Sequence, residues 1–410
     1  MDNTLKIAHV LRRFAFDEWG GTETVVWNLA QQQLAQGFQP EILATCALST
    51  PGEEYRNDIH IRRFPYWYPY FPMNAETRLT LDKKGGNPFA PKLFQALRQG
   101  RYDLIHIHCG GRLAVQCAQL ARRLGIPSLV TLHGGHAAVP REELAKMMAP
   151  TRGKFHYGGI FDRLLGLRKD VTAETDAVIC ISHAEQTALA SRLPHQRIVY
   201  LPNGINCQEF QIQPACSPRT EWNIPPERWL MLCISRIDYQ KNQLLLLEAL
   251  AQLPDAHLLL VGPVTSQAYY EKILQRSRDL DVENRLTIIP GLPHTDPRLK
   301  AILHEAAVFI LPSLHEPFGI VALEAWAAGL PVLAARVGGL PDFILHDRNG
   351  LLFNPQDASE LLAQLVRLRN DKALRGKLAA NALHDVQSYS WQAIARRLSE
   401  LYQELSHAKP

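Results

Sequence analysis

The stretch Leu311–Asp342, LPSLHEPFGIVALEAWAAGLPVLAARVGGLPD, decides the fold that this sequence predicts. The apolar run 308–311 is short and stops at Pro312, which indicates a buried parallel strand. A polar loop containing Glu316 follows, and residues 318–320 then open a helix whose free N–H groups can receive a phosphate. Because open α/β sheets bind ligands at the carboxyl ends of their strands, this loop is the first candidate for a binding site.

Two carboxylates frame that helix start, Glu316 in the loop and Glu324 two turns into the helix. Each can accept hydrogen bonds from a polyol, on either side of a phosphate held by the helix amides. This arrangement suits a nucleotide sugar, with sugar hydroxyls at Glu316 and the ribose at Glu324. The alternative is a purely structural role, since acidic residues are common in the first turns of helices.

The residues Glu316-Pro317-Phe318-Gly319 with Glu324, followed by Gly338-Gly339-Leu340-Pro341-Asp342, resemble the E-x7-E signature of the family-4 retaining glycosyltransferases. The resemblance implies the GT-B fold, an α/β architecture in which two Rossmann-like domains face each other across a cleft. It also implies that the donor lies against the helix start, at Phe318, Gly319 and Ile320. Asp342 departs mildly from the family, because many relatives carry Glu there.

Length supports two domains, since 410 residues exceed the usual size of one hydrophobic core. A proline-rich stretch without periodicity separates the halves and reads as a linker. We expect an N-terminal acceptor-side domain at 1–203, a linker at 204–228, a C-terminal nucleotide-sugar-binding domain at 229–385 and a helix within 386–410. By the resemblance, that last helix packs back on the first domain.

Composition narrows the class of protein. Seven cysteines without a C-x-x-C pair fit a reducing cytoplasm better than a disulfide framework. The N-terminus reads as a strand without a signal-peptide pattern, and no apolar run approaches the roughly 18 residues that span a bilayer. The net charge of +4 does not demand a nucleic-acid partner. Residues 1–203 hold about 24 Lys and Arg against about 18 Asp and Glu, so the basic excess lies in the first half.

A glycine-containing loop, Gly20-Gly21-Thr22-Glu23, leads into the first predicted helix. Glycines before a helix allow a backbone to approach an anion closely. The loop is not G-x-G-x-x-G, so it gives little support to a dinucleotide site, and a plain strand-to-helix turn is the alternative. By the resemblance, Gly20 and Gly21 meet the donor diphosphate or the acceptor.

Three other segments of the first half have an unusual composition or are expected to be loops. Residues 65–74, PYWYPYFPMN, form either an aromatic platform for an acceptor or a loop packed on the sheet. Residues 80–87 are expected to form a mobile loop. Residues 144–169 mix basic and apolar side chains in at most two short amphipathic helices, which suits either a membrane interface or a lid.

Several histidines lie on or directly after two predicted strands. His106 and His108 share one face of a strand, and His133 ends the strand 126–132, with His136 close behind. No metal-ligand spacing is present, and GT-B transferases do not generally need a metal, so we expect neither a metal nor another cofactor. A histidine at a strand's carboxyl end can donate to a sugar hydroxyl. By the resemblance, His133 contacts the donor sugar.

Two basic residues, Arg236 and Lys241, follow the strand predicted at 229–234. Lys241-Asn242 is expected to begin a helix, which would let both charges converge on one pyrophosphate. Isolated basic residues are more often solvated, but this spacing is similar to the family's [GS]-R-x4-K-[NG] pattern. Ser235 stands where glycine is usual.

The sequence therefore predicts a cytoplasmic retaining glycosyltransferase of the hexosyltransferase type, which uses a UDP- or GDP-sugar. His133, Arg236, Lys241 and Glu316 are its candidate catalytic residues. The hydroxyl acceptor is a glycan, a lipid-linked glycan or a small molecule of bacterial cell-envelope or polysaccharide synthesis, reached by peripheral membrane contact. A GT-B nucleotide-sugar epimerase and a catalytically silent nucleotide-sugar-binding protein are the alternatives.

Overall fold

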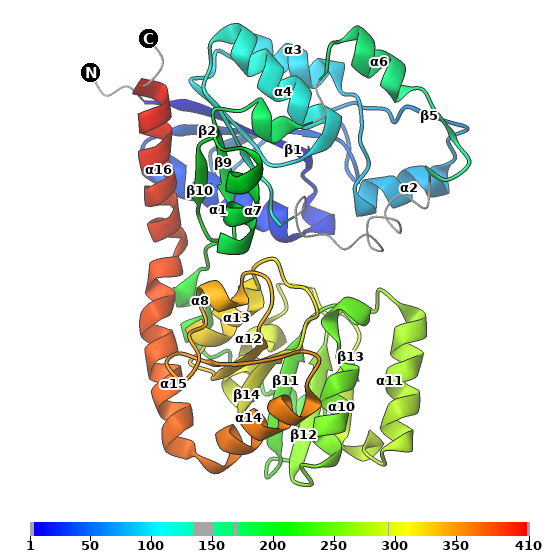
Figure 1. Ribbon diagram of the computed structural model, residues 1–410, viewed down its shortest axis with the longest axis vertical. Helices are drawn as coiled ribbons and strands as arrows, with labels where there is room; N and C mark the ends of the chain where they lie inside the picture. Colours follow the sequence, from blue (N-terminus) through cyan, green and yellow to red (C-terminus); the bar gives the residue numbers. More distant parts are fainter. Residues whose placement is uncertain (1–3, 135–150, 168–169, 294, 408–410) are drawn as a thin grey trace. The chain divides into compact units, whose positions relative to one another are not determined.

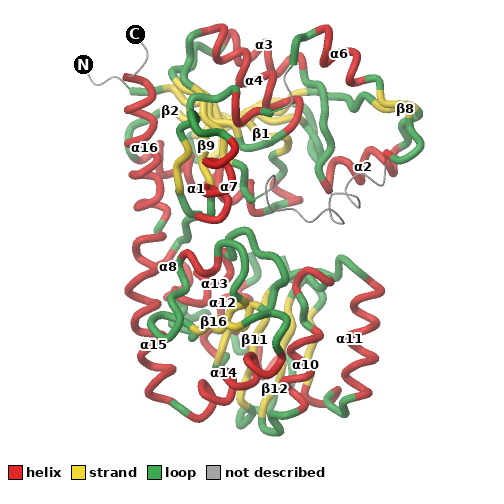
Figure 2. The backbone as a smooth tube through the Cα atoms, in the orientation of Figure 1, coloured by secondary structure: helices red, strands yellow, loops and turns green. Residues whose placement is uncertain are grey.

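The computed structural model describes residues 4–134, 151–167, 170–293 and 295–407, which form two compact units (Figure 1). The first unit comprises Met1–Asn203 and Trp391–Pro410, and the second comprises Gly204–Ser390. In each unit, helices cover both faces of a largely parallel sheet (Figure 2). Residues 204–228, expected as a linker, belong to the second unit and contain the short helices α8 (Cys207–Gln211) and α9 (Pro218–Glu221).

The sheet of the first unit has the strand order β10-β9-β7-β6-β1-β2-β4-β3, and only the β3–β4 pair is antiparallel. Its strands are β1 (Lys6–Arg13), β2 (Gln39–Thr45), β3 (Gly52–Arg56), β4 (Ile59–Phe64), β6 (Leu104–Ile107), β7 (Ser128–Thr131), β9 (Ala177–Cys180) and β10 (Ile198–Tyr200). Its helices are α1 (Gly21–Ala35), α2 (Ala75–Lys84), α3 (Pro91–Gln99), α4 (Gly111–Leu124), α6 (Gly158–Leu164), α7 (His183–Arg192) and α16 (Trp391–His407). The C-terminal helix α16 thus belongs to the first unit although it ends the chain.

The two faces of this sheet form separate hydrophobic cores. Alternate residues of β1 point to opposite faces, as the period of a strand requires. Ala8 and Val10 pack with α3 and α4, whereas Ile7 packs with α1 and α16. α16 is amphipathic, and its buried stripe includes Leu398 and Tyr402.

The sheet of the second unit has the order β13-β12-β11-β14-β15-β16, and all its strands are parallel. The strands are β11 (Trp229–Ile234), β12 (Ala256–Val261), β13 (Leu286–Ile289), β14 (Val308–Leu311), β15 (Val332–Ala335) and β16 (Leu351–Phe353). The helices are α10 (Leu244–Ala251), α11 (Gln267–Asp279), α12 (Pro297–Glu305), α13 (Ile320–Ala327), α14 (Ala358–Asn370) and α15 (Lys372–Asp385). This order reverses direction between β11 and β14, which is the place where doubly wound sheets bind ligands.

The prediction of a mobile loop at 80–87 is wrong for residues 80–84, which end α2. The Asn74 side chain caps this helix by accepting a hydrogen bond from the Thr77 amide at 2.8 Å. Asp82 then accepts hydrogen bonds from the hydroxyls of Tyr66 at 2.6 Å and Tyr68 at 2.8 Å. These hydrogen bonds hold residues 80–84 in the helix, and the local sequence pattern did not predict them.

The aromatic segment 65–74 divides into buried and exposed rings. Tyr66 and Tyr68 are buried in the core, so these two rings pack on the sheet. Trp67 and Phe71 are exposed and remain accessible to a ligand. Phe71 lies in β5 (Tyr70–Phe71), which pairs antiparallel with β8 (Phe155–His156) in a separate two-stranded sheet.

Part of the basic segment 144–169 lies outside the described residues, which omit 135–150 and 168–169. The described remainder contains β8 and α6. Among the helices that the structure describes, none is both long enough and apolar enough to cross a membrane.

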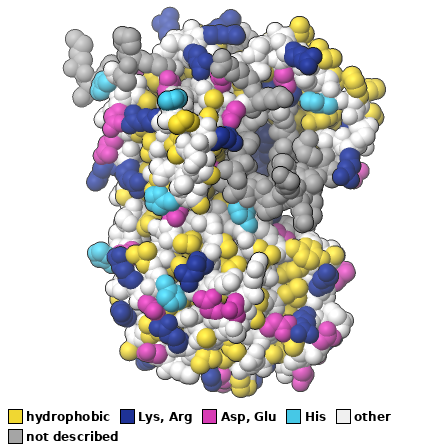
Figure 3. Space-filling view, in the orientation of Figure 1, with side chains coloured by type: hydrophobic (Ala, Val, Ile, Leu, Met, Phe, Trp, Pro, Cys, Tyr) yellow, Lys and Arg dark blue, Asp and Glu magenta, His cyan; other side chains and the backbone are white. Residues whose placement is uncertain are grey.

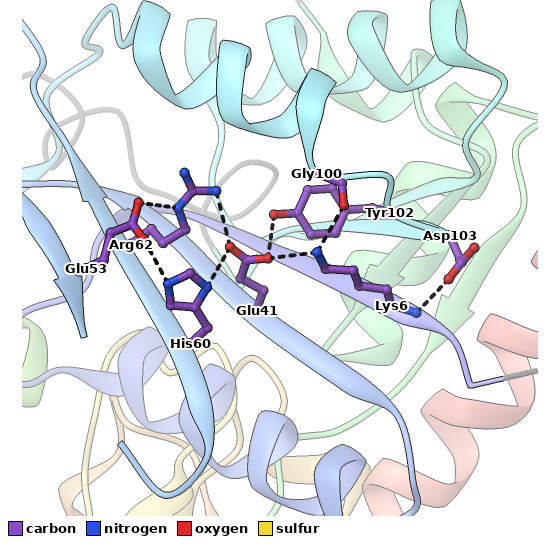
Figure 4. Close-up of polar contacts among 8 residues, drawn as sticks. All are labelled: Lys6, Glu41, Glu53, His60, Arg62, Gly100, Tyr102 and Asp103. Atoms are coloured by element: carbon purple, nitrogen blue, oxygen red, sulfur yellow. Dashed lines mark hydrogen bonds and ion pairs between the residues drawn. The ribbon is translucent and has the colours of Figure 1, made fainter. Parts of the chain in front are cut away.

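A buried carboxylate, Glu41 on β2, is stabilised by four surrounding polar groups (Figure 4). It accepts a hydrogen bond from the Tyr102 hydroxyl at 2.7 Å. It also forms ion pairs with Lys6 at 3.5 Å and Arg62 at 3.4 Å, and Nδ1 of His60 lies 3.2 Å from its carboxylate. The network joins β1, β2 and β4 with the chain segment just before β6.

We expect Glu41→Ala to lower the free energy of unfolding by about 1–3 kcal/mol, because it leaves the buried Tyr102 hydroxyl unpaired. Urea unfolding at pH 7 measures this. Glu53→Ala is the matched control, since the Glu53 side chain also pairs with His60 and Arg62 but is 55% exposed. We expect a loss below about 1 kcal/mol for the control. If both variants lost the same free energy of unfolding, burial would not explain the contribution of Glu41.

Candidate active site

The main candidate site lies at the switch point of the second unit. Arg236 follows β11, and the loop 312–316 follows β14, so adjacent parallel strands bring the two segments together. The expectation that Lys241 begins a helix is wrong. Lys241 ends a 3-10 turn, Tyr239–Lys241, and Asn242 adopts a left-handed conformation with φ of 56° before α10 begins at Leu244.

Lys241 and Glu316 form an ion pair at the centre of this site. The Lys241 Nζ lies 2.6 Å from Glu316 Oε2, and the side chains are only 12% and 11% exposed. The Ser313 hydroxyl donates a second hydrogen bond to the same carboxylate oxygen at 3.2 Å. Glu316 therefore has a fixed position, and its charge is compensated despite burial.

Gln240 ties the 3-10 turn to the loop after β14. Its side-chain amide donates to the backbone carbonyl of His315 at 3.0 Å, and the backbone carbonyl of Gln240 accepts from the Leu314 amide at 2.8 Å. Its side-chain oxygen accepts from Arg236 at 3.0 Å. Sequence reasoning missed Gln240, because its partner His315 in the loop after β14 lies 75 residues away.

Arg236 is the accessible cation of the site, with a side chain that is 47% exposed. Asp238 lies 3.4 Å from the Arg236 guanidinium and also accepts hydrogen bonds from the Gln240 and Lys241 amides. The site thus combines one exposed guanidinium with one largely buried ammonium. Both can attract an anion with two phosphates.

The loop carrying Glu316 lies directly against the glycine pair Gly338-Gly339. The Gly339 amide donates to the Glu316 carbonyl at 3.1 Å. Gly338 has φ of 55°, and a Cβ atom there would lie 1.9 Å from the Glu316 carbonyl oxygen. Only glycine fits such a close approach of two backbones, so this motif supports the position of Glu316.

The start of α13 supplies backbone donors. Gly319 precedes the helix with φ of 90° and provides no side-chain cap, so the first N–H groups of the helix can serve a ligand. The Phe318 side chain is 2% exposed and packs on Phe343, so only its backbone can contact a donor. Glu324 lies on α13, where burial, with a smaller contribution from the charge of Glu209, raises its pKa to about 7.

The Gly20-Gly21 loop of the first unit begins α1. Gly20 is the N-cap of this helix and forms no side-chain cap, while a Cβ at Gly21 would meet nothing within 4 Å. Glu23, buried in the first turn, forms an ion pair with Arg13 at 2.8 Å. Gly21 therefore lies in an open position, whereas a Cβ atom at Gly20 would lie 2.9 Å from the Glu23 carboxylate.

His133 follows β7 and adopts φ of 48°, a left-handed conformation that is uncommon outside glycine. Its Nε2 lies 3.2 Å from Nδ1 of His108, and burial lowers the pKa of His133 to about 4. The ring is therefore neutral at physiological pH, with one N–H and one free lone pair. Such conformations concentrate at functional sites, where the surrounding structure holds them in place.

A buried histidine cluster lies behind His133. The ring nitrogens of His9, His106 and His108 come within 4.8 Å of one another, as metal ligands do. Each of these rings already hydrogen-bonds through both nitrogens, and the partners include Gln33, Thr131 and Tyr402. A metal would have to break this network, so the absence of a metal site remains our prediction.

Comparison with protein families finds two matches. Residues 218–385 match the model described as Glycosyl transferases group 1, and residues 19–209 match the model described as Glycosyltransferase Family 4. An uncharacterised glycosyltransferase of Methanocaldococcus jannaschii is 30% identical, over 97% of this chain and 98% of the relative. A D-inositol 3-phosphate glycosyltransferase of Nocardioides is 27% identical, over 93% of this chain and 85% of the relative.

Solved structures share the fold. Sucrose-phosphate synthase from Thermosynechococcus elongatus matches with a TM-score of 0.72 and 23% identity, over 98% of this chain and 100% of that chain. Anabaena HepE in complex with UDP and glucose matches with a TM-score of 0.69 and 20% identity, over the same shares. The two-domain α/β architecture with parallel sheets is the GT-B fold of these proteins.

Proposed function

The chain belongs to the family-4, group 1 glycosyltransferases, and from this membership we propose that it transfers a sugar from a nucleoside diphosphate sugar to a hydroxyl acceptor with retention of configuration. The observation that carries the proposal is the Lys241–Glu316 pair beside Arg236 at the switch point of the second sheet. Such a cluster supplies two cations for a diphosphate and one carboxylate for sugar hydroxyls.

In the proposed complex, Arg236 and Lys241 bind the diphosphate together with the amides of Gly319 and Ile320. Glu316 accepts hydrogen bonds from sugar hydroxyls while it keeps Lys241 in place. Glu324 accepts from the ribose, and His133 contacts the sugar. Gly20 and Gly21 present amides to the diphosphate or to the acceptor.

In the proposed reaction, the bond between the anomeric carbon and the phosphate oxygen breaks, and a bond from the acceptor oxygen to the same face of that carbon forms. The acceptor proton passes to the departing phosphate oxygen. Negative charge grows on the diphosphate in the transition state, where the two cations and the helix amides stabilise it. These groups act on the leaving group, so no enzyme nucleophile is required.

The anomeric product of slow donor hydrolysis tests the mechanism without a known acceptor. Incubation with an α-linked nucleoside diphosphate sugar should release the α-anomer first, as observed by proton NMR before mutarotation. Initial release of the β-anomer would contradict retention. An epimerised free sugar would favour a GT-B nucleotide-sugar epimerase, and binding without any turnover, with or without candidate acceptors, would favour a catalytically silent protein.

The affinity for the donor should depend on pH through Glu324. Its raised pKa means that the carboxylate is partly protonated near pH 7 in the free protein. Because the ionised form accepts both ribose hydroxyls, donor affinity should increase from pH 6 to pH 8, by up to about tenfold per pH unit below the pKa. Calorimetric titration with a nucleoside diphosphate sugar measures this, since its phosphates do not titrate in that range.

Glu324→Gln is the control for this prediction, because it keeps the size of the side chain and removes its titration. The variant should bind the donor more weakly at pH 8 and should lose the pH dependence. Glu209 and Lys300 also act electrostatically on Glu324, so the Glu209→Gln variant should shift the midpoint to lower pH. A pH dependence that survives in Glu324→Gln would place the ribose elsewhere.

We include peripheral membrane contact in the proposal because of one surface of the first unit. Hydrophobic side chains gather over α6 and the β5–β8 pair (Figure 3). Leu164 is 78% exposed, Phe71 68% and Phe155 65%. Arg152 and Arg163 are exposed among them. A basic apolar surface suits an anionic bilayer, and a lipid-linked glycan of cell-envelope synthesis is the corresponding acceptor.

Sedimentation with anionic vesicles at low salt should recover the protein in the pellet, and high salt should release it. Each exposed Arg near an anionic surface contributes about 1 kcal/mol, so Arg152→Glu with Arg163→Glu should weaken binding at least tenfold. Ile212→Ser is the control variant. It removes an apolar side chain that is 70% exposed but belongs to the second unit and not to this surface. A wild type that stays in the supernatant would indicate a freely diffusing acceptor.

A further inference from the structure

A continuous chain of hydrogen-bonded side chains leads from the interior of the first unit to His133. Gln33 Oε1 lies 2.7 Å from Nε2 of His9, and Nδ1 of His9 lies 3.0 Å from Nε2 of His108. Nδ1 of His108 then lies 3.2 Å from Nε2 of His133. Each imidazole thus joins the next through one nitrogen on either side.

The fold explains why these residues meet. His9 lies on β1, His108 follows β6, and His133 follows β7, and these strands are neighbours in the sheet. Helices α1 and α16 cover this face, and α1 contributes Gln33. Gln33 and His9 are fully buried, and His108 is 4% exposed, so water does not compete for their hydrogen bonds.

The rings of this chain are neutral. Burial lowers the pKa of His9 and of His133 to about 4, and that of His108 well below its usual value. A neutral imidazole has one N–H donor and one lone-pair acceptor. Consequently, the direction of any one hydrogen bond in the chain fixes the direction of all the others.

Gln33 supplies that direction. Its Oε1 can only accept, so His9 carries its proton on Nε2 and accepts at Nδ1. His108 must then donate from Nε2, and His133 in turn donates from Nε2 to Nδ1 of His108. The Gln33 amide is held in this orientation because its Nε2 donates to the Tyr402 hydroxyl at 3.3 Å.

A second branch agrees with this orientation. The Tyr402 hydroxyl lies 2.6 Å from Nδ1 of His106, so it can donate to that nitrogen while it accepts from Gln33. His106 then donates from Nε2 to the Thr131 hydroxyl at 2.7 Å. With the Gln33 amide in this orientation, one arrangement of protons therefore satisfies every hydrogen bond in both branches.

We propose that Gln33 is a positioning residue that fixes His133 as the Nε2–H tautomer through His9 and His108, so that Nδ1 of His133 accepts a hydrogen bond from a substrate hydroxyl. The inference rests on the proposed contact between His133 and the donor sugar. It changes the expected chemistry of that contact, because His133 accepts a hydrogen bond from the sugar hydroxyl instead of donating one to its oxygen. The sugar must carry a free hydroxyl at the contact, and a fluorine in its place cannot bind equally well.

Selective 15N labelling of histidine reports the tautomer directly, through two-bond couplings between ring protons and nitrogens. The His133 signals are identified by their loss in His133→Gln. The wild type should show His9, His108 and His133 as Nε2–H tautomers. Finding His133 as the Nδ1–H tautomer or as a cation at pH 7 would overturn the proposal.

Gln33→Met tests the role of Gln33, because methionine has a similar size and cannot accept in the same way. We expect His133 to become a mixture of both tautomers in this variant. Tyr402→Phe, which frees the Gln33 amide to rotate, should have the same effect if Gln33→Met folds poorly. Gln32→Met is the matched control on the same helix and should leave the spectrum unchanged. An unaltered His133 signal in both Gln33→Met and Tyr402→Phe would refute the relay.

Kinetics then connect the tautomer to the reaction. Losing one oriented hydrogen bond should lower kcat/KM for the donor about 2- to 10-fold in Gln33→Met. The preference for the natural donor over its deoxyfluoro analogue at the contacted position should decrease by the same factor. If the wild type shows no transfer at all, the proposed function fails while the NMR result stands. If transfer is normal and the tautomer is wrong, only the relay fails.

Discussion

Replacing Arg236 and Lys241 together by alanine should lower kcat by about 100-fold or more, because both cations oppose charge that grows on the departing diphosphate. The individual variants should differ. Arg236 is half exposed, so its loss should leave the site intact and lower kcat more than it raises KM. Lys241→Ala should also leave Glu316 unpaired in a largely buried position, so it should weaken donor binding as well.

Arg278→Ala is the matched control for this experiment. Arg278 lies in the last turn of α11. This helix begins after the carboxyl end of β12 and leads back to the amino-terminal end of the next strand, β13. Its removal should change kcat less than twofold, as expected for a surface residue away from the site. Steady-state release of nucleoside diphosphate compares all four variants with the wild type. Near-normal turnover of a folded double variant would remove these cations from the mechanism.

Gly338→Ala should reduce donor affinity and kcat/KM by at least about tenfold, although it lies outside the proposed contacts with the substrate. The added Cβ would lie 1.9 Å from the Glu316 carbonyl oxygen, so the loop carrying Glu316 must move. Displacement of an oriented catalytic group by about 1 Å can cost about 100-fold in rate. The left-handed φ of 55° adds about 1 kcal/mol or more of strain for alanine.

Gly329→Ala separates the clash from the strain. Gly329 has a similar φ of 72°, but a Cβ there would meet nothing within 4 Å. We expect both variants to lose stability, as measured by urea unfolding, and only Gly338→Ala to lose donor affinity. If Gly329→Ala impaired binding equally, general loosening of the unit would explain the effect and the support of Glu316 by Gly338 would be refuted.

Short-range signals in the sequence predicted much of the second unit correctly. The strand at 308–311 is confirmed to the residue, because an apolar run ended by proline is a purely local pattern. The helix that carries Glu324 is also where the sequence placed it. The GT-B fold inferred from the resemblance is confirmed by the architecture and by the matching structures.

Contacts between distant residues could not be predicted in the same way. The Lys241–Glu316 pair joins side chains 75 residues apart, and it forms only because two strands are neighbours in the folded sheet. The left-handed Asn242, which delays α10, is not visible in the apolar pattern of that helix.

The histidine cluster shows the same limit. The period of a strand placed His106 and His108 on one face. Gln33 and Tyr402, however, reach the cluster from helices far apart in the sequence. Gln33 and His9 lie 24 residues apart, so no local pattern pairs them.

Binding of free nucleotides tests the central claim most directly, because it requires neither the acceptor nor the sugar to be known. UDP, GDP, ADP and CDP should be titrated against the wild type and the Arg236→Ala, Lys241→Ala double variant by thermal unfolding. We expect at least one of them, at 100 times its dissociation constant, to stabilise the wild type by about 2.7 kcal/mol, and the double variant to respond much less. A folded wild type that none of the four stabilises, or an equal response of the double variant, would contradict a nucleoside diphosphate site at Arg236, Lys241 and Glu316.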